Sequence, residues 1–528
     1  MLVERAELPP GAVVRPLVWV LKIKNGDVSA RPCADGSRLK PGVDFDPAKT
    51  STANASAAAA KTFLAQAAHH RQRVSFRDVR AACAQSPRNP GCACVRPGPS
   101  CPSTIYHSIH DGVLEQPGTW YLATLHNVNG EPTAGRGWED HHRAVAQEMG
   151  WRPMTADLAL LVYNPPTAPW PVQPVEQPAG QHEPAPDAPD RLADPAAPAM
   201  VQYVDDIAFR TPDTPEGRKC VDAYEQRFPC SKPSNPDEAM FLGVKIHQNI
   251  EGHPGEIQVS QTHVIDALAN KVLAEPWKGQ APKTPVPIGP WPTLQPRGAA
   301  ELTSEQKNHQ AAVGALNQLV IWTRPDARHA VSRLQATASN PQPIDFLNLR
   351  RLVEYLRSTR QERLRFKPPP AAADKMKLEV FTDASLDTTS TAGTMVKING
   401  TTIIAKCKRI APAPRSAMEA ELAAMSDGLR QGQGIRQILV EAGDLDQHEP
   451  VVIKADNAAA CAHARGFTTN GANRHFVIQI RPLQEALWNS SCVIEQVSSA
   501  DQEAAILTKP LREPRVRFLT DKLLGHSS

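Results

Sequence analysis

The hydrophobic positions of this chain follow two periods, one typical of strands and one typical of helices. In the first half, strand-like runs are predicted at 17–24, 28–31, 74–80, 158–163, 200–209, 241–246 and 256–260. Apolar residues at helical spacing predict helices over 53–68, 138–149, 304–322, 327–338 and 346–356. The pattern therefore indicates an α+β first part that is followed by a mainly helical segment.

A second unit with its own order of elements begins near residue 376. It has strands at 377–382, 393–398, 401–406, 451–455 and 492–497, and helices at 417–429, from about 457, and at 474–487. Strands and helices that alternate in this way predict a mixed α/β layer fold. The prolines at 368–370 and the alanines after them make a linker between the two parts.

One tract is unlike the rest in composition. Residues 165–198 carry 11 of the 50 prolines, together with Gln, Glu, Ala and Asp. Such a segment cannot bury a core, so we expect an extended, disordered loop. It separates the strands at 158–163 and 200–209, which predicts a β-hairpin with an enlarged connection. Each doubling of loop length costs only about 0.6 kcal/mol, so the insertion is compatible with the hairpin.

Charge and hydropathy limit the cellular location and the partners. The chain has 58 Lys+Arg and 55 Asp+Glu, a formal net charge of +3, so a nucleic-acid-binding face would have to be local. No run of about 18 apolar residues is present, which excludes a transmembrane helix. The first ten residues lack the apolar segment of a secretory signal. We therefore expect an intracellular protein, cytoplasmic or nuclear, without membrane contacts.

The sequence Tyr203-Val-Asp-Asp206 interrupts an apolar run with two adjacent acids. A hairpin tip with two solvated aspartates is one interpretation, and a divalent-metal site at the end of a hairpin is the other. The second needs a further carboxylate from elsewhere in the chain. Asp78 is a candidate, because strand alternation places it on the same face as Val74 and Phe76.

Acidic residues in the second unit stand where its predicted strands end. Asp383 ends the first strand and Asp456 ends the fourth, while Glu421 lies on the first helix, slightly better placed than Glu419 to reach the sheet. Convergent carboxylates repel one another unless a cation lies between them, and Mg²⁺ is a usual occupant. Each acid taken alone fits a surface position better, but the set in this order favours a metal site.

These motifs, with several others in the same order, carry a family likeness. The chain resembles the reverse transcriptase–RNase H region of a copia-type (Pseudoviridae) LTR retrotransposon polyprotein over nearly its whole length. The matching blocks in the first part include Phe76-Arg-Asp-Val-Arg80, Tyr203-Val-Asp-Asp206, Phe241-Leu-Gly243 and Thr323-Arg-Pro-Asp326. Those in the second part include Phe381-Thr-Asp-Ala384, Met418-Glu-Ala-Glu421, Ala455-Asp-Asn457 and Ile506-Leu-Thr-Lys-Pro-Leu511.

The resemblance implies a fold and a division into domains. The implied fold is an α+β polymerase with palm and fingers and a helical thumb or connection, followed by an α/β RNase H-like domain. Fingers and palm would span 1–270, with the insertion at 165–198, and the thumb and connection 271–370. The RNase H-like domain would span 376–512, and 513–528 would be a tail.

The resemblance also implies two metal-dependent sites. Asp78, Asp205 and Asp206 would hold the Mg²⁺ or Mn²⁺ ions of an RNA-directed DNA polymerase, which uses two-metal displacement for nucleotidyl transfer. The ions that cut the RNA strand of an RNA–DNA hybrid would be held by Asp383, Glu421 and Asp456.

The implied partners are an RNA or DNA template-primer and dNTPs. A template-primer groove needs basic contacts to the nucleic-acid backbone. Tyr203, Arg31 and Arg136 are the candidates for binding nucleic acid or nucleotide, with the Arg350–Arg351 pair as a further one. Each arginine is equally compatible with a solvated charge. The sequence does not determine the oligomeric state.

Three departures from the family pattern bear on activity. Thr133 stands where a glutamine is usual, and Asp35 lies near the place of a family lysine. Ala505 replaces the fourth RNase H carboxylate, with only Asp501 or Glu503 close enough in sequence to substitute. We therefore expect a reverse transcriptase with impaired RNase H activity. The alternative is a decayed retrotransposon remnant that at most binds nucleic acid.

Overall fold

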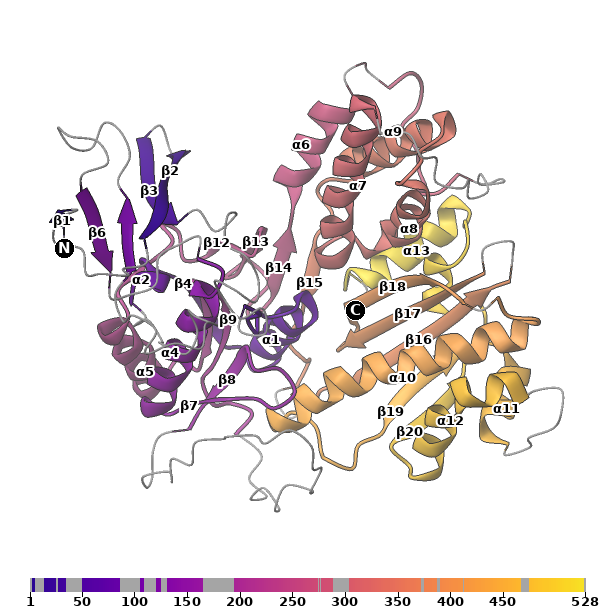
Figure 1. Cartoon of the computed structure of the whole chain (residues 1–528). Helices are drawn as coiled ribbons and strands as arrows, with labels where there is room; N and C mark the ends of the chain where they lie inside the picture. Colours follow the sequence, from indigo (N-terminus) through magenta and orange to yellow (C-terminus); the bar gives the residue numbers. More distant parts are fainter. Residues whose placement is uncertain are drawn as a thin grey trace.

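The described residues of this mixed α/β protein form four β-sheets, with helices packed among them (Figure 1). The computed structural model describes residues 2–4, 14–24, 27–34, 50–85, 105–108, 120–124, 131–164, 194–273, 275, 277–287, 303–371, 375–386, 390–411, 413–466 and 474–526. The predicted disordered tract lies outside these residues, apart from 194–198.

The first sheet has the strand order β1-β6-β5-β2-β3. Its strands are β1 (Leu2–Glu4), β2 (Val14–Lys24), β3 (Asp27–Ala34), β5 (Ile105–Ser108) and β6 (Trp120–Thr124). The predicted hairpin is present, with Lys24 opposite Asp27 across β2 and β3. The hydrophobic pattern did not predict β5, a four-residue strand that pairs with β2. So short a strand depends on this long-range pairing, which local sequence does not reveal.

The second sheet has the order β11-β4-β10-β9-β8-β7. Its strands are β4 (Arg73–Val79), β7 (Trp151–Pro153), β8 (Leu160–Tyr163), β9 (Ala199–Tyr203), β10 (Asp206–Thr211) and β11 (Cys230–Ser231). The hairpin across the proline-rich tract is present, with Leu160 opposite Val201. A two-residue turn at Val204–Asp205 divides the strand-like run over 200–209 into β9 and β10, which places this acidic sequence at a hairpin tip, as one interpretation of the sequence had it.

Helices cover both faces of this sheet. On one face, α4 (Ala134–Glu148) and α5 (Pro215–Arg227) bury Trp138 and Tyr224 against Phe209. Helix α1 (Ala57–His69) lies on the other face, where its Phe63 joins a core with residues of β4 and β9. A short helix, α2 (Ala82–Gln85), follows β4.

The third sheet has the order β12-β13-β14-β15 and adjoins a helical segment. Its strands are β12 (Glu238–Phe241), β13 (Val244–His247), β14 (Ile257–Ser260) and β15 (Leu364–Phe366). The predicted strand over 241–246 was wrong, because Leu242 and Gly243 form a turn with φ values of 52° and 77°. The helical segment comprises α6 (Thr262–Val272), α7 (Ser304–Trp322), η4 (Pro325–Ala327), α8 (Arg328–Thr337) and α9 (Pro343–Ser358), which share a separate core.

The C-terminal sheet has the order β18-β17-β16-β19-β20. Its strands are β16 (Leu378–Ser385), β17 (Thr391–Ile398), β18 (Thr401–Arg409), β19 (Val451–Ala455) and β20 (Cys492–Gln496). The remaining elements are α10 (Ala417–Glu441), α11 (Ala458–Arg465), α12 (Arg474–Trp488), η5 (Glu503–Leu507) and α13 (Glu513–Leu523). Helix α13 lies in the segment 513–528, which was expected to be a tail. Its Leu519 and Leu523 pack with Phe381 of the sheet.

Helix α1 joins the second sheet to the C-terminal sheet (Figure 1). Of its 13 residues, 11 are buried. Gln66 Nε2 donates to Asp444 Oδ2 at 2.5 Å, and Lys61 Nζ donates to the carbonyl of Ile321 at 2.7 Å. The alanines of this helix thus reflect close packing on several sides. None of the helices in the described part of the chain is long and apolar enough to cross a membrane.

Helix α10 continues twelve residues beyond its predicted end at 429, and two of its glycines let it approach the sheet closely. A Cβ at Gly432 would lie 2.7 Å from Val451 Cγ1 and 2.8 Å from Val380 Cγ2. We expect Gly432→Ala to destabilise the protein by about 1–2 kcal/mol in thermal unfolding, although alanine favours helix. The matched control is Gly434→Ala, where the Cβ meets nothing within 4 Å. It is expected to stabilise by about 0.5–1 kcal/mol, and equal effects would contradict the packing argument.

Candidate functional site

Asp383, Glu421 and Asp456 meet at one end of the C-terminal sheet. β16 and β19 are parallel neighbours, which brings Asp383 on β16 and Asp456 just after β19 to the same edge. Glu421 comes from the first turns of α10. One ligand atom from each carboxylate lies within 4.8 Å of the others. Among the described residues, no other set of three or more His, Cys, Asp or Glu side chains meets this condition. The convergence expected from the order of elements is therefore present in the structure.

Burial dominates the electrostatics of this acidic triad. Glu421 is 6% exposed, and burial followed by the nearby charge of Asp383 raises the pKa of its carboxyl to about 8. Burial also raises the pKa of Asp383, although the Lys509 ammonium opposes that shift. Ser499 Oγ donates to Asp456 Oδ2 at 2.8 Å. Without a cation, the site therefore retains a proton on Glu421 near neutral pH.

The donor set suits a hard divalent cation. All three side chains offer carboxylate oxygens, the ligands that Mg²⁺ prefers in proteins. Glu421 Oε1 accepts a hydrogen bond from the Ala384 amide at 3.3 Å. Its other oxygen, Oε2, is buried and has no hydrogen-bond partner. Because a buried, unsatisfied oxygen costs about 1–3 kcal/mol, a ligand at this oxygen would relieve a real penalty.

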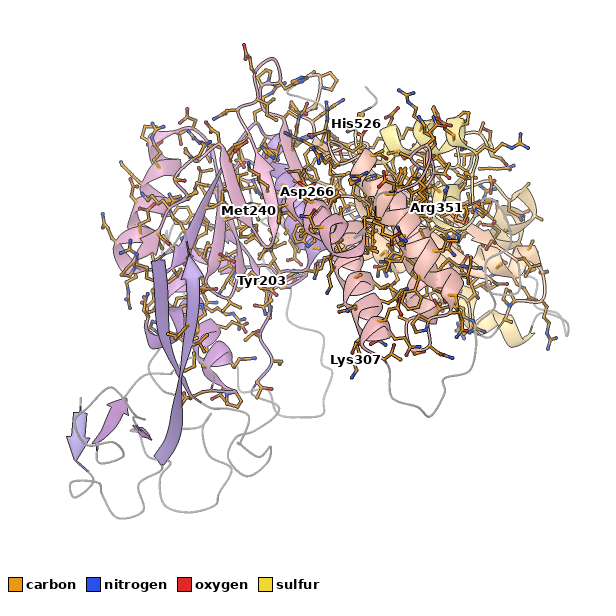
Figure 2. All side chains as sticks on the ribbon, turned by 90° about the horizontal axis from the view of Figure 1, so that it is seen from above. Tyr203, Met240, Asp266, Lys307, Arg351 and His526 are labelled. Carbon is orange, nitrogen blue, oxygen red and sulfur yellow. The ribbon has the colours of Figure 1, made fainter. Side chains whose placement is uncertain are left out.

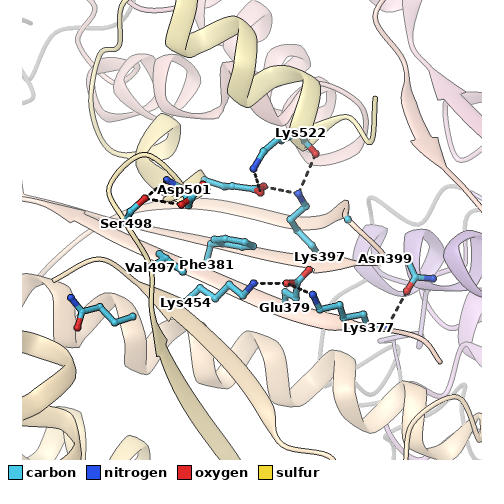
Figure 3. Close-up of a pocket in the computed structure, with 13 residues that line it drawn as sticks. Lys377, Glu379, Phe381, Lys397, Asn399, Lys454, Val497, Ser498, Asp501 and Lys522 are labelled. Atoms are coloured by element: carbon cyan, nitrogen blue, oxygen red, sulfur yellow. Dashed lines mark hydrogen bonds and ion pairs between the residues drawn. The ribbon is translucent and has the colours of Figure 1, made fainter. Parts of the chain in front are cut away.

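The position at which the resemblance implies a fourth RNase H carboxylate lies beside this triad. Ala505 is in η5, and its carbonyl lies 3.2 Å from the hydroxyl oxygen of Thr508, which donates to Asp383. Neither acid that the sequence offered as a substitute is available. Glu503 binds Lys397 at 2.6 Å in a neighbouring cavity of about 710 Å³, and Asp501 accepts from Ser498 at 2.7 Å (Figure 3). The structure therefore supplies no fourth carboxylate from these two residues.

The raised pKa of Glu421 predicts a pH dependence of stability in the metal-free protein. The folded-state pKa of about 8 exceeds the ordinary value of 4.5. The stability that the protonated carboxyl contributes is therefore fully present below pH 4.5 and is lost as the pH rises through 8. We expect the free energy of unfolding to fall by about 1–2 kcal/mol between pH 7 and pH 9. Glu421→Gln should abolish this fall, as measured by denaturant unfolding in EDTA.

The matched control for this prediction is Glu419→Gln on the same helix, where the carboxylate accepts from the Arg415 amide. That variant should retain the dependence of the unmodified protein. If Glu421→Gln and Glu419→Gln show the same pH profile, Glu421 is not the titrating group.

A second set of acids surrounds the turn between β9 and β10. Asp206 opposes Asp78 across β10 and β4, and the Val79 amide donates to the Asp205 carbonyl at 2.8 Å. The backbone thus brings Asp78, Asp205 and Asp206 to one end of the second sheet. Asp78 is exposed, and Asp205 and Asp206 are partly exposed. Their carboxylate oxygens do not gather within the 4.8 Å that joins the triad in the C-terminal sheet.

Two features hold this turn. Val204 has a φ of 54°, a left-handed conformation that is uncommon for a β-branched residue and costs about 1–3 kcal/mol. The fully buried Trp138 of α4 donates its indole N–H to the Val204 carbonyl at 2.7 Å. Strained backbone that is stabilised by a buried neighbour is typical of functional sites.

The turn faces a cavity of about 680 Å³. Tyr203 and Asp206 contribute one wall, and the β12–β13 turn contributes Leu242 and Gly243. The remaining walls come mainly from helices α6 and α7, toward which Tyr203 lies, 39% exposed (Figure 2). The cavity thus joins the acidic turn to the Leu242–Gly243 turn.

The arginines that the sequence suggested for nucleic-acid binding are less clearly placed. Arg136 pairs with Asp140 one turn further along α4, at 2.9 Å. Arg350 and Arg351 donate to backbone carbonyls of Glu275 and Thr284, at 3.3 and 3.0 Å. Arg31 is on β3, and its side chain lies outside the described residues. Arg136 thus pairs with an acid of its own helix, and Arg350 and Arg351 bind backbone carbonyls.

Sequence reasoning missed three side chains at these sites. Lys509 Nζ lies 3.1 Å from Asp383 Oδ1, Thr508 donates to the same carboxylate, and Trp138 supports the Val204 turn. Thr508 and Lys509 belong to a motif that matched the family, so the signal was present without a chemical role. The contact of Trp138 joins residues that lie 66 positions apart in the sequence, which no local pattern reveals.

Comparisons with known proteins find retrovirus-related Pol polyproteins of plant transposons among the relatives. The chain is 28% identical over 327 residues to the retrovirus-related Pol polyprotein from transposon RE2 of Arabidopsis thaliana, which is 60% of this chain and 21% of that polyprotein. It is 26% identical over 332 residues to the corresponding polyprotein from transposon RE1 of the same plant, or 61% and 21% of the two chains. The chain thus spans about a fifth of the length of these relatives. No family model matches it.

One solved structure aligns with the chain at a low level of similarity. The foamy viral protease–reverse transcriptase in complex with double-stranded DNA aligns with 94% of this chain and 67% of its own, with a TM-score of 0.47 and 11% identity. The sequence matches to plant transposon polyproteins agree with the motifs found along the chain. The chain is therefore similar to retrovirus-related Pol polyproteins of plant transposons, over about a fifth of their length.

Proposed function

We propose that this chain is an RNA-directed DNA polymerase with an attached RNase H-like domain of low activity. The observation that carries the proposal is the strained Val204–Asp205 turn, which sets Asp206 beside Asp78 and faces the 680 Å³ cavity. In this proposal, the second sheet with α4 and α5 is the palm, and helices α6 to α9 form the thumb and connection.

The residues of the polymerase site have distinct roles in this proposal. Asp78, Asp205 and Asp206 hold two divalent ions, Mg²⁺ or Mn²⁺, at the end of the second sheet. When bound, these ions activate the primer 3′-hydroxyl and neutralise the charge of the leaving pyrophosphate. Tyr203 and the Leu242–Gly243 turn, which line the same cavity, position the end of the primer. Catalysis then depends on positioning and charge neutralisation more than on proton transfer by a side chain.

In the RNase H-like domain, the acidic triad would hold a divalent ion against the RNA strand of a hybrid. Ala505 offers no carboxylate, and Glu503 is committed to Lys397. With fewer ligands, the site holds its ions less tightly at ordinary Mg²⁺ concentrations. We therefore expect slow or absent cleavage of the RNA strand.

Primer extension tests the polymerase proposal. The full chain is incubated with a labelled DNA primer on an RNA template, the four dNTPs and Mg²⁺ or Mn²⁺. We expect extension of the primer that stops in EDTA and resumes when Mg²⁺ is added in excess. The matched control is Glu421→Gln, which alters only the RNase H-like site and should extend the primer at the unmodified rate.

The same assay separates the proposal from a decayed remnant. If the folded chain binds the template-primer, as measured by fluorescence anisotropy, but extends it with neither ion, the polymerase proposal is wrong. A labelled RNA–DNA hybrid tests the other domain, where rapid cleavage that disappears in Glu421→Gln would contradict the expected impairment.

A further inference from the structure

The ammonium group of Lys509 already occupies part of the acidic triad. Lys509 Nζ lies 3.1 Å from Asp383 Oδ1. The lysine side chain is 43% exposed, whereas that of Asp383 is 1% exposed, so the cation reaches the buried acid from the solvent side. A positive charge within this distance is what convergent carboxylates require in the absence of metal.

The segment that carries Lys509 is held firmly on the sheet. The amide of Lys509 donates to the Ala505 carbonyl at 3.3 Å, and the hydroxyl oxygen of Thr508 lies 3.2 Å from the same carbonyl. Thr508 packs so closely on β17 that a Cβ at Gly393 would lie 2.7 Å from its Cγ2. Both Asp383 oxygens therefore have partners from two consecutive residues, the Thr508 hydroxyl and the Lys509 ammonium. The position of the lysine follows from this anchored backbone.

The charges of the site fit one divalent ion better than two. The three carboxylates carry three negative charges when ionised, and a divalent ion with one ammonium group balances them. In two-metal sites the ions lie about 3.5–4 Å apart, so a second ion would have to compete with the ammonium group at Asp383. A fourth carboxylate would favour the second ion, but Ala505 supplies none.

We infer that the triad binds a single divalent ion, with the Lys509 ammonium on Asp383 in place of a second one. This inference rests on the proposed role of the triad as a metal site. Lys509 is a positioning residue in this account, because it fixes the charge and the orientation of Asp383. The RNase H-like site is then a one-ion site, whatever the polymerase site binds.

Counting bound Mn²⁺ tests the inference in the full chain. All samples carry Asp205→Asn and Asp206→Asn, so that the count reports the triad, and binding is followed by calorimetry and electron paramagnetic resonance. The background protein should bind one Mn²⁺ with the spectrum of an isolated ion. Lys509→Met should still bind one, about tenfold more tightly, because a neighbouring positive charge is removed. Lys509→Met combined with Ala505→Asp should bind two.

The control is Lys454→Met, which removes a lysine of the same sheet that pairs with Glu379 and should leave number and affinity unchanged. Two ions in the background protein would overturn the inference, and so would an unchanged or weaker affinity in Lys509→Met. A purely structural lysine would predict weaker binding on its removal, because the site would lose order. If Asp383→Asn leaves Mn²⁺ binding unchanged, the triad is not a metal site and the proposed function of this domain fails as well.

Discussion

Replacement of Asp205 by Asn is expected to lower primer extension by about 10³-fold or more, with little change in stability. Asp205 is the second residue of the Val204–Asp205 turn, and its backbone carbonyl accepts from the Val79 amide. Asparagine keeps the size of the side chain and this backbone bond, but it removes the negative charge that a divalent ion requires. The expected result is therefore a loss of turnover in a folded protein.

Single-turnover primer extension at saturating dNTP measures the loss, and thermal unfolding checks the fold. The matched control is Asp222→Asn on α5, an exposed acid away from the turn, which should extend primers within about twofold of the unmodified rate. Activity above a tenth of the unmodified level in Asp205→Asn would mean that Asp205 holds no essential ion.

The C-terminal sheet shows what hydrophobic pattern and order can predict. Strands β16 and β17 are nearly continuous buried runs, and β19 alternates between buried and partly buried residues, so their number and order could be predicted from the sequence. The helical phase of α10 favoured Glu421 over Glu419, and Glu421 is the residue that reaches the triad. Local periodicity was sufficient here because each acid is placed by its own element.

The turns of the second and third sheets show where that reasoning fails. Val204 adopts positive φ although it is β-branched, and Leu242 does so before Gly243. The first turn has no Gly or Asn to mark it, and Trp138 holds it from a distant helix. The hydrophobic pattern alone therefore indicates one long strand where the protein forms two. The pairing of Glu503 with Lys397 is equally invisible, because 106 positions separate the two residues.

Thr323-Arg-Pro-Asp326 was recognised as a motif, and the structure supplies its physical role. Arg324 donates two hydrogen bonds to the Asp326 carboxylate, at 2.8 and 3.0 Å, and both side chains are at most 1% exposed. Tyr355 of α9 donates to the same carboxylate at 2.7 Å, and Arg324 also binds Thr359. Burial would raise the pKa of Asp326, but the charge and hydrogen bonds of Arg324 lower it overall. This buried network ties α7 and η4 to α9.

Asp326→Ala is expected to destabilise the helical segment by about 3–5 kcal/mol, because it leaves Arg324 buried without a counter-charge. Hydrogen exchange of the amides of α7 and α9 gives the local free energy directly, without assuming that the whole chain unfolds in one step. The double variant Arg324→Met, Asp326→Leu removes both charges and should cost far less, since well-packed apolar pairs often replace buried ion pairs without loss. If the double variant is as unstable as Asp326→Ala, the network contributes through packing and hydrogen bonds to Tyr355 and Thr359, not through pairing of the two charges.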